Sequence, residues 1–95
     1  MTGSGNVSIE RTVTIVNQRG LHARAAAKFV RLAGEFSSKI EVTKDGETVS
    51  GRSIMGLMML AAATGCSIHL EASGADARAA VDSIARLVED KFDED

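Results

Sequence analysis

The chain of 95 residues contains no proline, tryptophan or tyrosine, and it has one cysteine and three phenylalanines. The scarcity of aromatic side chains predicts a core made mainly of aliphatic residues. A single cysteine, Cys66, excludes an internal disulfide and a cysteine-rich zinc site, and we interpret it as a small residue at the start of a strand. No apolar run approaches the roughly 20 residues that a membrane-spanning helix needs, so no membrane association is expected.

The N-terminal segment lacks the features of a secretion signal. Residues 1–6 are polar and rich in glycine, with neither a basic region nor an apolar region. We therefore expect a flexible leader at residues 1–6, a single domain at residues 7–95, and a cytoplasmic location. The hydrophobic content of 44% is typical of a soluble globular protein of this size.

Acidic residues are missing from one long segment of the chain. Between Arg11 and Gly34 every charged residue is basic, whereas the last seven residues hold five acidic side chains and one lysine. The basic residues of the first segment are Arg11, Arg19, Arg24, Lys28 and Arg31. This asymmetry predicts an electropositive region suited to phosphate and to an acidic partner surface.

Hydrophobic periodicity predicts seven regular elements. Alternation predicts strands at residues 7–16, 39–43, 47–50 and 67–73, and helical spacing predicts helices at residues 23–34, 54–60 and 77–91. Asp45 and Gly46 are typical of a hairpin turn, and Ser53 and Asp76 are apt caps for the helices that follow them. The order βαββαβα, with one-sided elements, predicts a two-layer α+β fold that permits a split βαβ arrangement.

Two histidines differ in their surroundings. His22 stands where the first strand pattern gives way to the first helix pattern, next to backbone amides that have no acceptor within the helix. The positive end of the helix favours an anion, so we expect a neutral, nucleophilic imidazole beside a phosphate seat made by the amides of Ala23 and Arg24. Arg24 adds a planar donor for phosphate oxygens. His69 lies in the fourth strand between buried positions, so we expect it to face outward without a role.

Two motifs carry a family resemblance. Residues 20–26 read Gly-Leu-His-Ala-Arg-Ala-Ala, and residues 51–58 read Gly-Arg-Ser-Ile-Met-Gly-Leu-Met. In this order they resemble the histidine and serine sites of the HPr family, the phosphocarriers of the bacterial phosphotransferase system. The resemblance covers the chain from about Val7 to its end. The last five residues are similar to those of the nitrogen-branch (NPr) members, and both the sugar branch and the nitrogen or regulatory branch stay open.

The resemblance implies a fold and roles for individual residues. It implies an HPr-like βαββαβα open sandwich with an antiparallel sheet in the order 1-4-2-3 and three helices on one face. It implies phosphorylation of His22 at Nδ1, assistance from Arg24, and a regulatory phosphorylation of Ser53 by a serine kinase or phosphorylase found in some bacteria. The implied docking patch, which leaves Leu57 and Leu60 in the core, consists of Ile54, Met55 and Met58. The family usually has proline where this chain has Ala25, so the helix start has either one more amide donor or a looser geometry.

The implied function is that of a stoichiometric carrier rather than an independent catalyst. Enzyme I, charged by phosphoenolpyruvate, would phosphorylate His22, and an EIIA-type domain would receive the group. No cofactor, metal or nucleic acid is required, and the protein is expected to be a monomer. Two alternatives stay open: a regulatory protein-binding module in which His22 is never modified, and a small acylphosphatase-like hydrolase, for which we see no residue to activate water.

Overall fold

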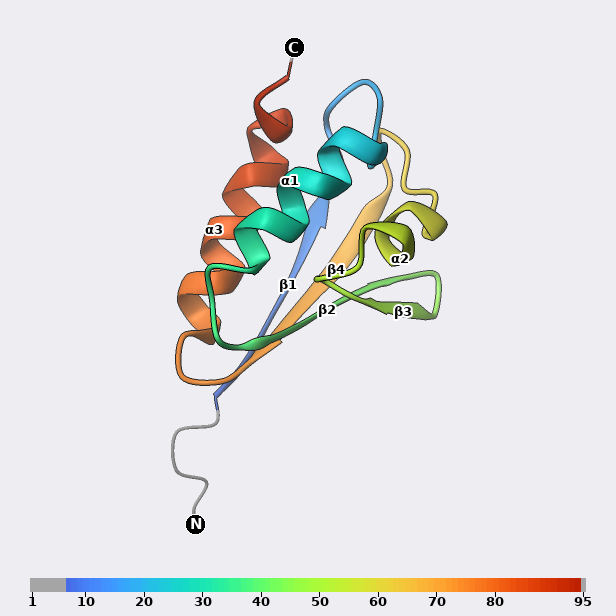
Figure 1. Cartoon of the computed structure of the whole chain (residues 1–95). Coiled ribbons are helices and arrows are strands. Elements are labelled where there is room, and N and C mark those ends of the chain that lie inside the picture. Colours follow the sequence, from blue (N-terminus) through green and yellow to red (C-terminus); the bar gives the residue numbers. More distant parts are fainter. Residues whose placement is uncertain (1–6, 95) are drawn as a thin grey trace.

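The computed structural model describes residues 7–94 and contains every element that the periodicity predicts (Figure 1). The predicted leader at residues 1–6 lies outside the described residues. The strands are β1 (Ser8–Thr14), β2 (Lys39–Lys44), β3 (Glu47–Ser50) and β4 (Ser67–Ser73). The helices are α1 (Ala23–Ala33), α2 (Ile54–Met59) and α3 (Ala77–Glu89), followed by a short 3-10 turn, η1 (Lys91–Asp93).

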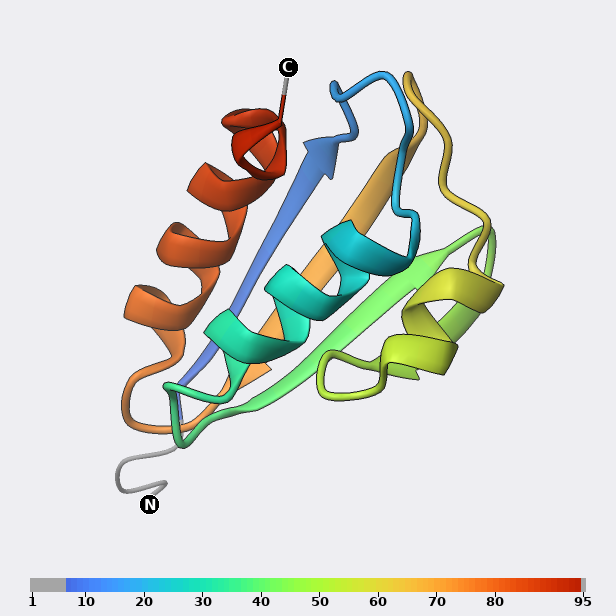
Figure 2. The same cartoon turned by 45° about the horizontal axis from the view of Figure 1, so that its top comes forward.

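The four strands form one antiparallel sheet in the order β1-β4-β2-β3, as the resemblance implied. All three helices lie on one face of this sheet, which Figure 1 and Figure 2 show from two directions. Thr12 pairs with His69 between β1 and β4, and Thr43 pairs with His69 between β2 and β4. These residues belong to the opposite, open face, where His69 bonds Glu10 and is partly exposed, so its outward direction is confirmed.

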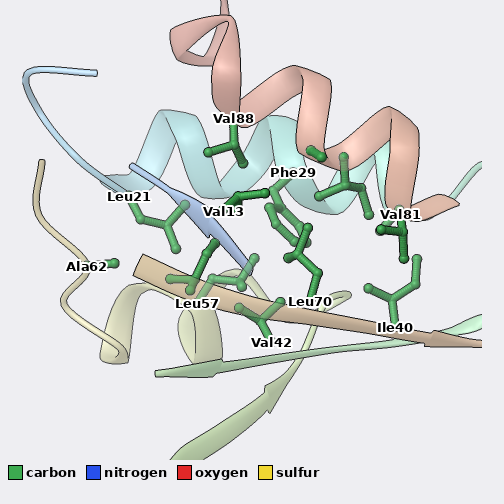
Figure 3. Close-up of a cluster of buried hydrophobic side chains, with 14 of the residues drawn as sticks. Val13, Leu21, Phe29, Ile40, Val42, Leu57, Ala62, Leu70, Val81 and Val88 are labelled. Carbon is green, nitrogen blue, oxygen red and sulfur yellow. The ribbon is translucent and has the colours of Figure 1, made fainter. Parts of the chain in front are cut away.

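The core lies between the sheet and the helices and is aliphatic apart from two phenylalanines (Figure 3). Phe29 of α1 is fully buried at its centre, and Leu57 of α2 and Leu70 of β4 pack in the same cluster. Burial of a side chain of this size stabilises the fold by about 1.5–3 kcal/mol before entropic costs. The expected aliphatic core is therefore confirmed, and its position determines which face of each helix is buried.

The turn between β2 and β3 has the geometry that its sequence predicts. Asp45 and Gly46 both have positive φ, at 51° and 82°, as a primed two-residue hairpin turn requires. The strand that follows it keeps its predicted bounds. The last helix is shorter than expected, because the chain leaves the helix after Glu89 and turns through left-handed residues instead of continuing to Lys91.

Asp76 stands at the predicted cap position of α3, but its side chain does not cap that helix. Its carboxylate accepts hydrogen bonds from the amides of Ser37 and Ser38, at 2.8 and 2.9 Å, and from the Ser38 hydroxyl. The Ser38 hydroxyl, followed by the Ser37 amide, lowers the pKa of Asp76. The capping prediction is therefore wrong for the side chain, because the Asp76 carboxylate instead connects the loop after β4 to the loop after α1.

No helix within the described residues is long and apolar enough to cross a lipid bilayer. Cys66 is a free, partly buried thiol directly before β4, where it contacts the core. This position agrees with its interpretation as a small residue at the start of a strand.

Candidate functional site

The loop between β1 and α1 is held against the loop that follows α2. The amide of Leu21 donates to the Ala62 carbonyl at 2.8 Å, and the amide of Gly65 donates to the Ile15 carbonyl at 2.8 Å. Gly20 has φ +67°, and a Cβ at this position would lie 2.6 Å from the Ala62 oxygen. Only glycine fits this close approach, so the backbone that leads into His22 has a defined path.

His22 is the N-cap residue of α1, as its place in the sequence predicts. Its backbone is extended, with φ −76° and ψ 178°, and its carbonyl accepts the first helical hydrogen bond, from Ala26 at 2.8 Å. Within residues 7–94, no acceptor pairs with the amides of Ala23, Arg24 or Ala25. The imidazole therefore stands beside three free donors at the positive end of a helix dipole.

Asn17 is a site residue that the sequence interpretation missed. It is fully buried, and its Nδ2 donates to the Gly20 carbonyl and to Glu94 Oε1, both at 2.8 Å. Its Oδ1 is buried without a partner in the part of the chain that the structure describes. One short side chain thus shapes the loop before His22 and also binds the C-terminal segment.

The C-terminal segment returns to the site through an unusual turn. Lys91, Phe92 and Asp93 all have positive φ, at 59°, 54° and 60°. The Phe92 side chain is fully buried, and the Lys28 ammonium of α1 donates to the Phe92 carbonyl at 2.7 Å. Figure 1 and Figure 2 show this end of the chain beside the loop that enters α1. Burial and hydrogen bonding offset the backbone cost of consecutive left-handed residues, which is about 1–2 kcal/mol each.

This turn places Glu94 on His22. Glu94 Oε2 lies 2.8 Å from His22 Nε2, and both side chains are about one-fifth exposed, at 19% and 20%. The Asn17 amide, reinforced by His22 and by the positive charge of Arg19, lowers the pKa of Glu94. The carboxylate is therefore ionised near neutral pH and acts only as a hydrogen-bond acceptor.

The contact adds a negative charge to the region that the sequence predicts to be electropositive. The basic segment remains, but an acidic residue 72 positions away lies against its histidine. Arg11 is also neutralised in part, since it forms an ion pair with Asp82 at 2.8 Å. Charge counted along the chain missed both effects, because it ignores which distant residues the fold brings together.

Arg24 and Ser53 occupy the expected positions but differ in their contacts. The Arg24 side chain is exposed, and no hydrogen bond or ion pair joins it to His22 among the described residues. Ser53 is the N-cap of α2, where its hydroxyl accepts a hydrogen bond from the Gly56 amide at 2.9 Å. The capping prediction for Ser53 is confirmed.

The helix α2 presents an apolar surface next to the site. Leu57 and Leu60 are buried, at 0% and 4% exposure, as predicted. Ile54, Met55 and Met58 are exposed, so the expectation that they lie on the surface is confirmed. Met59, which the sequence interpretation left unassigned, is exposed as well. We call these four side chains the α2 patch; they are Ile54, Met55, Met58 and Met59.

A shallow depression of about 200 Å³ lies beside the imidazole. His22, Arg19 and Leu21 form one side of it, and the loop after α2 forms the other through Ala61, Ala62 and Ala63. The described residues contain no cluster of three or more His, Cys, Asp or Glu side chains arranged to hold a metal ion. The site therefore combines one histidine, free backbone donors, an exposed guanidinium and a positioned carboxylate. The backbone donors and the guanidinium suit phosphoryl oxygens at the helix start.

Comparisons with known proteins agree with this arrangement. A family model described as "PTS HPr component phosphorylation site" matches residues 9–90. The phosphocarrier protein HPr of Cupriavidus necator is 44% identical over 86 residues, which cover 90% of this chain and 97% of that protein. The phosphocarrier protein NPr of Shewanella violacea is 48% identical over 86 residues, covering 90% of this chain and 94% of that protein.

The solved structures give the same result. The crystal structure of HPr-C-His from Thermoanaerobacter tengcongensis superposes with a TM-score of 0.88 and 45% sequence identity, covering 92% of this chain and 98% of that chain. Fold, motifs and relatives coincide over nearly the whole described chain, and the chain belongs to the HPr family of phosphotransferase-system phosphocarriers.

Proposed function

We propose that the protein is a cytoplasmic phosphocarrier whose His22 accepts a phosphoryl group from phosphoenolpyruvate-charged enzyme I and passes it to a histidine of an EIIA-type domain. One observation carries this proposal: His22 caps α1 beside amides that have no acceptor within the described residues. Family membership supports the coarser role, that of a carrier with partners of the phosphotransferase kind.

The chemistry is an exchange of one nitrogen–phosphorus bond for another. The Nδ1 lone pair of His22 bonds to phosphorus while the bond to the donor histidine breaks, and that electron pair returns to the donor nitrogen. The amides of Ala23 and Arg24 and the helix dipole offset negative charge on the phosphoryl oxygens. The exposed Arg24 guanidinium is free to add a charge-assisted hydrogen bond. Positioning and electrostatics supply most of the rate in phosphoryl transfer.

The α2 patch supports a docking role for this face. Ile54, Met55 and Met58 expose apolar surface on the helix whose following loop lines the depression at His22. Flexible methionine side chains adapt to more than one partner, which a carrier that meets a donor and an acceptor in turn requires.

Ser53 is part of the same proposal, as a regulatory phosphorylation site. A phosphate there adds up to about two negative charges at the start of α2, beside the apolar patch, and would weaken docking of both partners. Incubation with a serine kinase of this system tests the role: an acid-stable phosphate adduct that Ser53→Ala abolishes supports it, and an adduct that persists in Ser53→Ala contradicts it.

The branch of the phosphotransferase system to which this protein belongs is defined by the EIIA-type domain that receives its phosphoryl group. Relatives named HPr and NPr match this chain at similar identity, and its acidic end resembles the nitrogen-branch members. We propose a nitrogen or regulatory branch. A phosphotransfer assay with EIIA domains of both branches tests this choice, because faster transfer to a sugar-branch domain would contradict it.

The main experiment is intact-mass measurement after incubation with phosphoenolpyruvate, Mg²⁺ and enzyme I. We expect one acid-labile phosphate adduct on the wild-type protein and none on His22→Ala. His69→Ala is the matched control, since it removes the other histidine from the opposite face of the sheet, and it should be phosphorylated like the wild type.

Two results would contradict the proposal. An adduct that survives in His22→Ala would place the phosphate on another residue. No adduct on the wild-type protein, with an enzyme I shown to be active on a known carrier, would favour a regulatory binding module without phosphotransfer.

A further inference from the structure

The C-terminal segment around Glu94 is built into the fold at three points. Phe92 is fully buried, the Lys28 ammonium binds the Phe92 carbonyl at 2.7 Å, and the Glu94 amide donates to the Lys91 carbonyl at 3.0 Å. The first two contacts join the turn to the core and to α1, and the third lies within the turn. All three hold the backbone that leads to the Glu94 side chain. Glu94 therefore approaches His22 from an anchored backbone.

The orientation of the carboxylate is fixed by its two oxygens. Oε1 accepts from the buried Asn17 amide at 2.8 Å, and Oε2 lies 2.8 Å from His22 Nε2. Asn17 is held in turn by its bond to the Gly20 carbonyl. The Asn17 side chain thus positions both the loop that carries the His22 imidazole and the Glu94 carboxylate that contacts this imidazole.

We propose that Glu94 is a positioning residue for phosphotransfer: its carboxylate keeps the ring proton of His22 on Nε2 and leaves the Nδ1 lone pair as the nucleophile. This inference rests on the proposed function of His22. A carboxylate accepts hydrogen bonds and does not donate them, so the 2.8 Å contact needs a proton on Nε2. A neutral imidazole has one N–H, and the partner of that N–H selects the tautomer.

The same contact assists the transfer step. When Nδ1 bonds to phosphorus and keeps Nε2–H, the ring gains one positive charge and the donor ring loses one. The Glu94 carboxylate lies where that positive charge develops, as the acidic member of a Ser-His-Asp triad does. The proton stays on Nε2 throughout, so the step balances without a base.

Few other charged groups act on this pair in the described part of the chain. Arg19 exerts an attractive charge interaction on Glu94 from the β1–α1 loop, and Lys28 reaches the turn from α1 through the Phe92 carbonyl. Asp93 is exposed and makes no side-chain hydrogen bond among residues 7–94. Asp93 therefore offers a matched control one residue from Glu94.

The test compares Glu94→Gln with Asp93→Asn, which remove the same charge from the same turn. The glutamine keeps the shape of Glu94 but both accepts and donates, so it permits either tautomer of His22. The tautomer is measured by 15N NMR of histidine-labelled protein without any partner, at a pH where titration shows the His22 ring to be neutral. The rate of phosphoryl acceptance from enzyme I is measured separately.

We expect Nε2–H in the wild type and in Asp93→Asn, and a mixed population in Glu94→Gln. Acceptance should fall about 10-fold in Glu94→Gln alone, the lower end of the loss seen when the hydrogen-bond partner of a metal-ligating histidine is removed. An Nδ1–H tautomer in the wild type, or equal tautomers and rates in all three proteins, would overturn the inference. A wild type that enzyme I does not phosphorylate would refute the proposed function instead, because the NMR result does not depend on any partner.

Discussion

At the scale of single residues, the site depends on small side chains that let distant segments meet. Gly20 lies against the backbone of the loop after α2, and Asn17 fills the space beneath the loop that carries His22. Neither residue performs chemistry in the proposed mechanism. Both determine where the imidazole stands relative to the start of α1.

We predict that Gly20→Ala destabilises the protein by about 2 kcal/mol or more. A left-handed φ costs a residue with a Cβ about 1–2 kcal/mol, and the new methyl would also lie 2.6 Å from the Ala62 oxygen. Gly46→Ala is the matched control, because Gly46 has φ +82° but no atom within 4 Å of its would-be Cβ. Urea unfolding measures both variants, and equal losses would show that the close approach at Gly20 adds nothing.

At the scale of elements, the first turn of α1 is the structural basis of the proposed phosphate seat. Ala25 is the third helical residue, its amide has no acceptor among the described residues, and its side chain is buried. The sequence interpretation left open whether this alanine adds a donor or loosens the helix start. The helix begins at Ala23 as predicted, so its boundary is unaffected by the missing proline.

We predict that Ala25→Pro changes the free energy of unfolding by less than about 1 kcal/mol, because proline in the first turn removes only an unpaired amide. Arg31→Pro, in the last turn of the same helix, should cost about 3 kcal/mol or more, since it removes a helical hydrogen bond. Thermal unfolding compares the two variants. A similar loss in both would mean that the first turn does not tolerate proline.

The phosphotransfer rate of Ala25→Pro tests whether the backbone amide of Ala25 contributes to the phosphate seat. If the extra amide contributes to the seat, acceptance from enzyme I slows and the lifetime of the phosphohistidine changes. An unchanged rate and lifetime would show that the amides of Ala23 and Arg24 suffice.

At the scale of the whole molecule, two carboxylates connect segments that lie far apart in the sequence. Asp76 connects the loop after β4 to the loop after α1, and Glu94 connects the end of the chain to the loop before α1. Hydrogen bonds in the folded state lower the pKa of both groups. Each therefore stabilises the fold when it is ionised.

We predict a loss of stability in acid that depends on Asp76. A group whose pKa is lowered in the folded state contributes fully above its unfolded pKa, here 3.8 for Asp76 and 4.5 for Glu94, and the contribution is lost as the pH falls through the folded value. Asp76→Asn should lower the melting temperature at pH 7 and weaken the dependence of the melting temperature on pH below about 3.8.

Glu35→Gln is the control for this measurement, since Glu35 is exposed and its side chain forms no hydrogen bond among residues 7–94. Calorimetry between pH 2 and pH 7 compares the three proteins. Parallel curves for Asp76→Asn and the wild type would rule out a role for Asp76 in the acid response.

The elements, their buried faces and the position of His22 all follow from local patterns in the sequence. These depend on periodicity, turn residues and caps within a few positions of each other, as at Asp45, Gly46 and Ser53. The strand order came from the resemblance to a family, because the two-layer pattern alone permits other arrangements of the same strands.

The contacts of Glu94, Asn17 and Asp76 arise only when the chain has folded. Glu94 reaches His22 through Lys91, Phe92 and Asp93 in a left-handed conformation that local preferences disfavour and that burial of Phe92 compensates. Asp76 stands where a cap residue is expected, yet its carboxylate accepts hydrogen bonds from the amides of Ser37 and Ser38 in the loop after α1 instead. Such choices depend on free energies gained between segments far apart in the chain, which no local pattern contains.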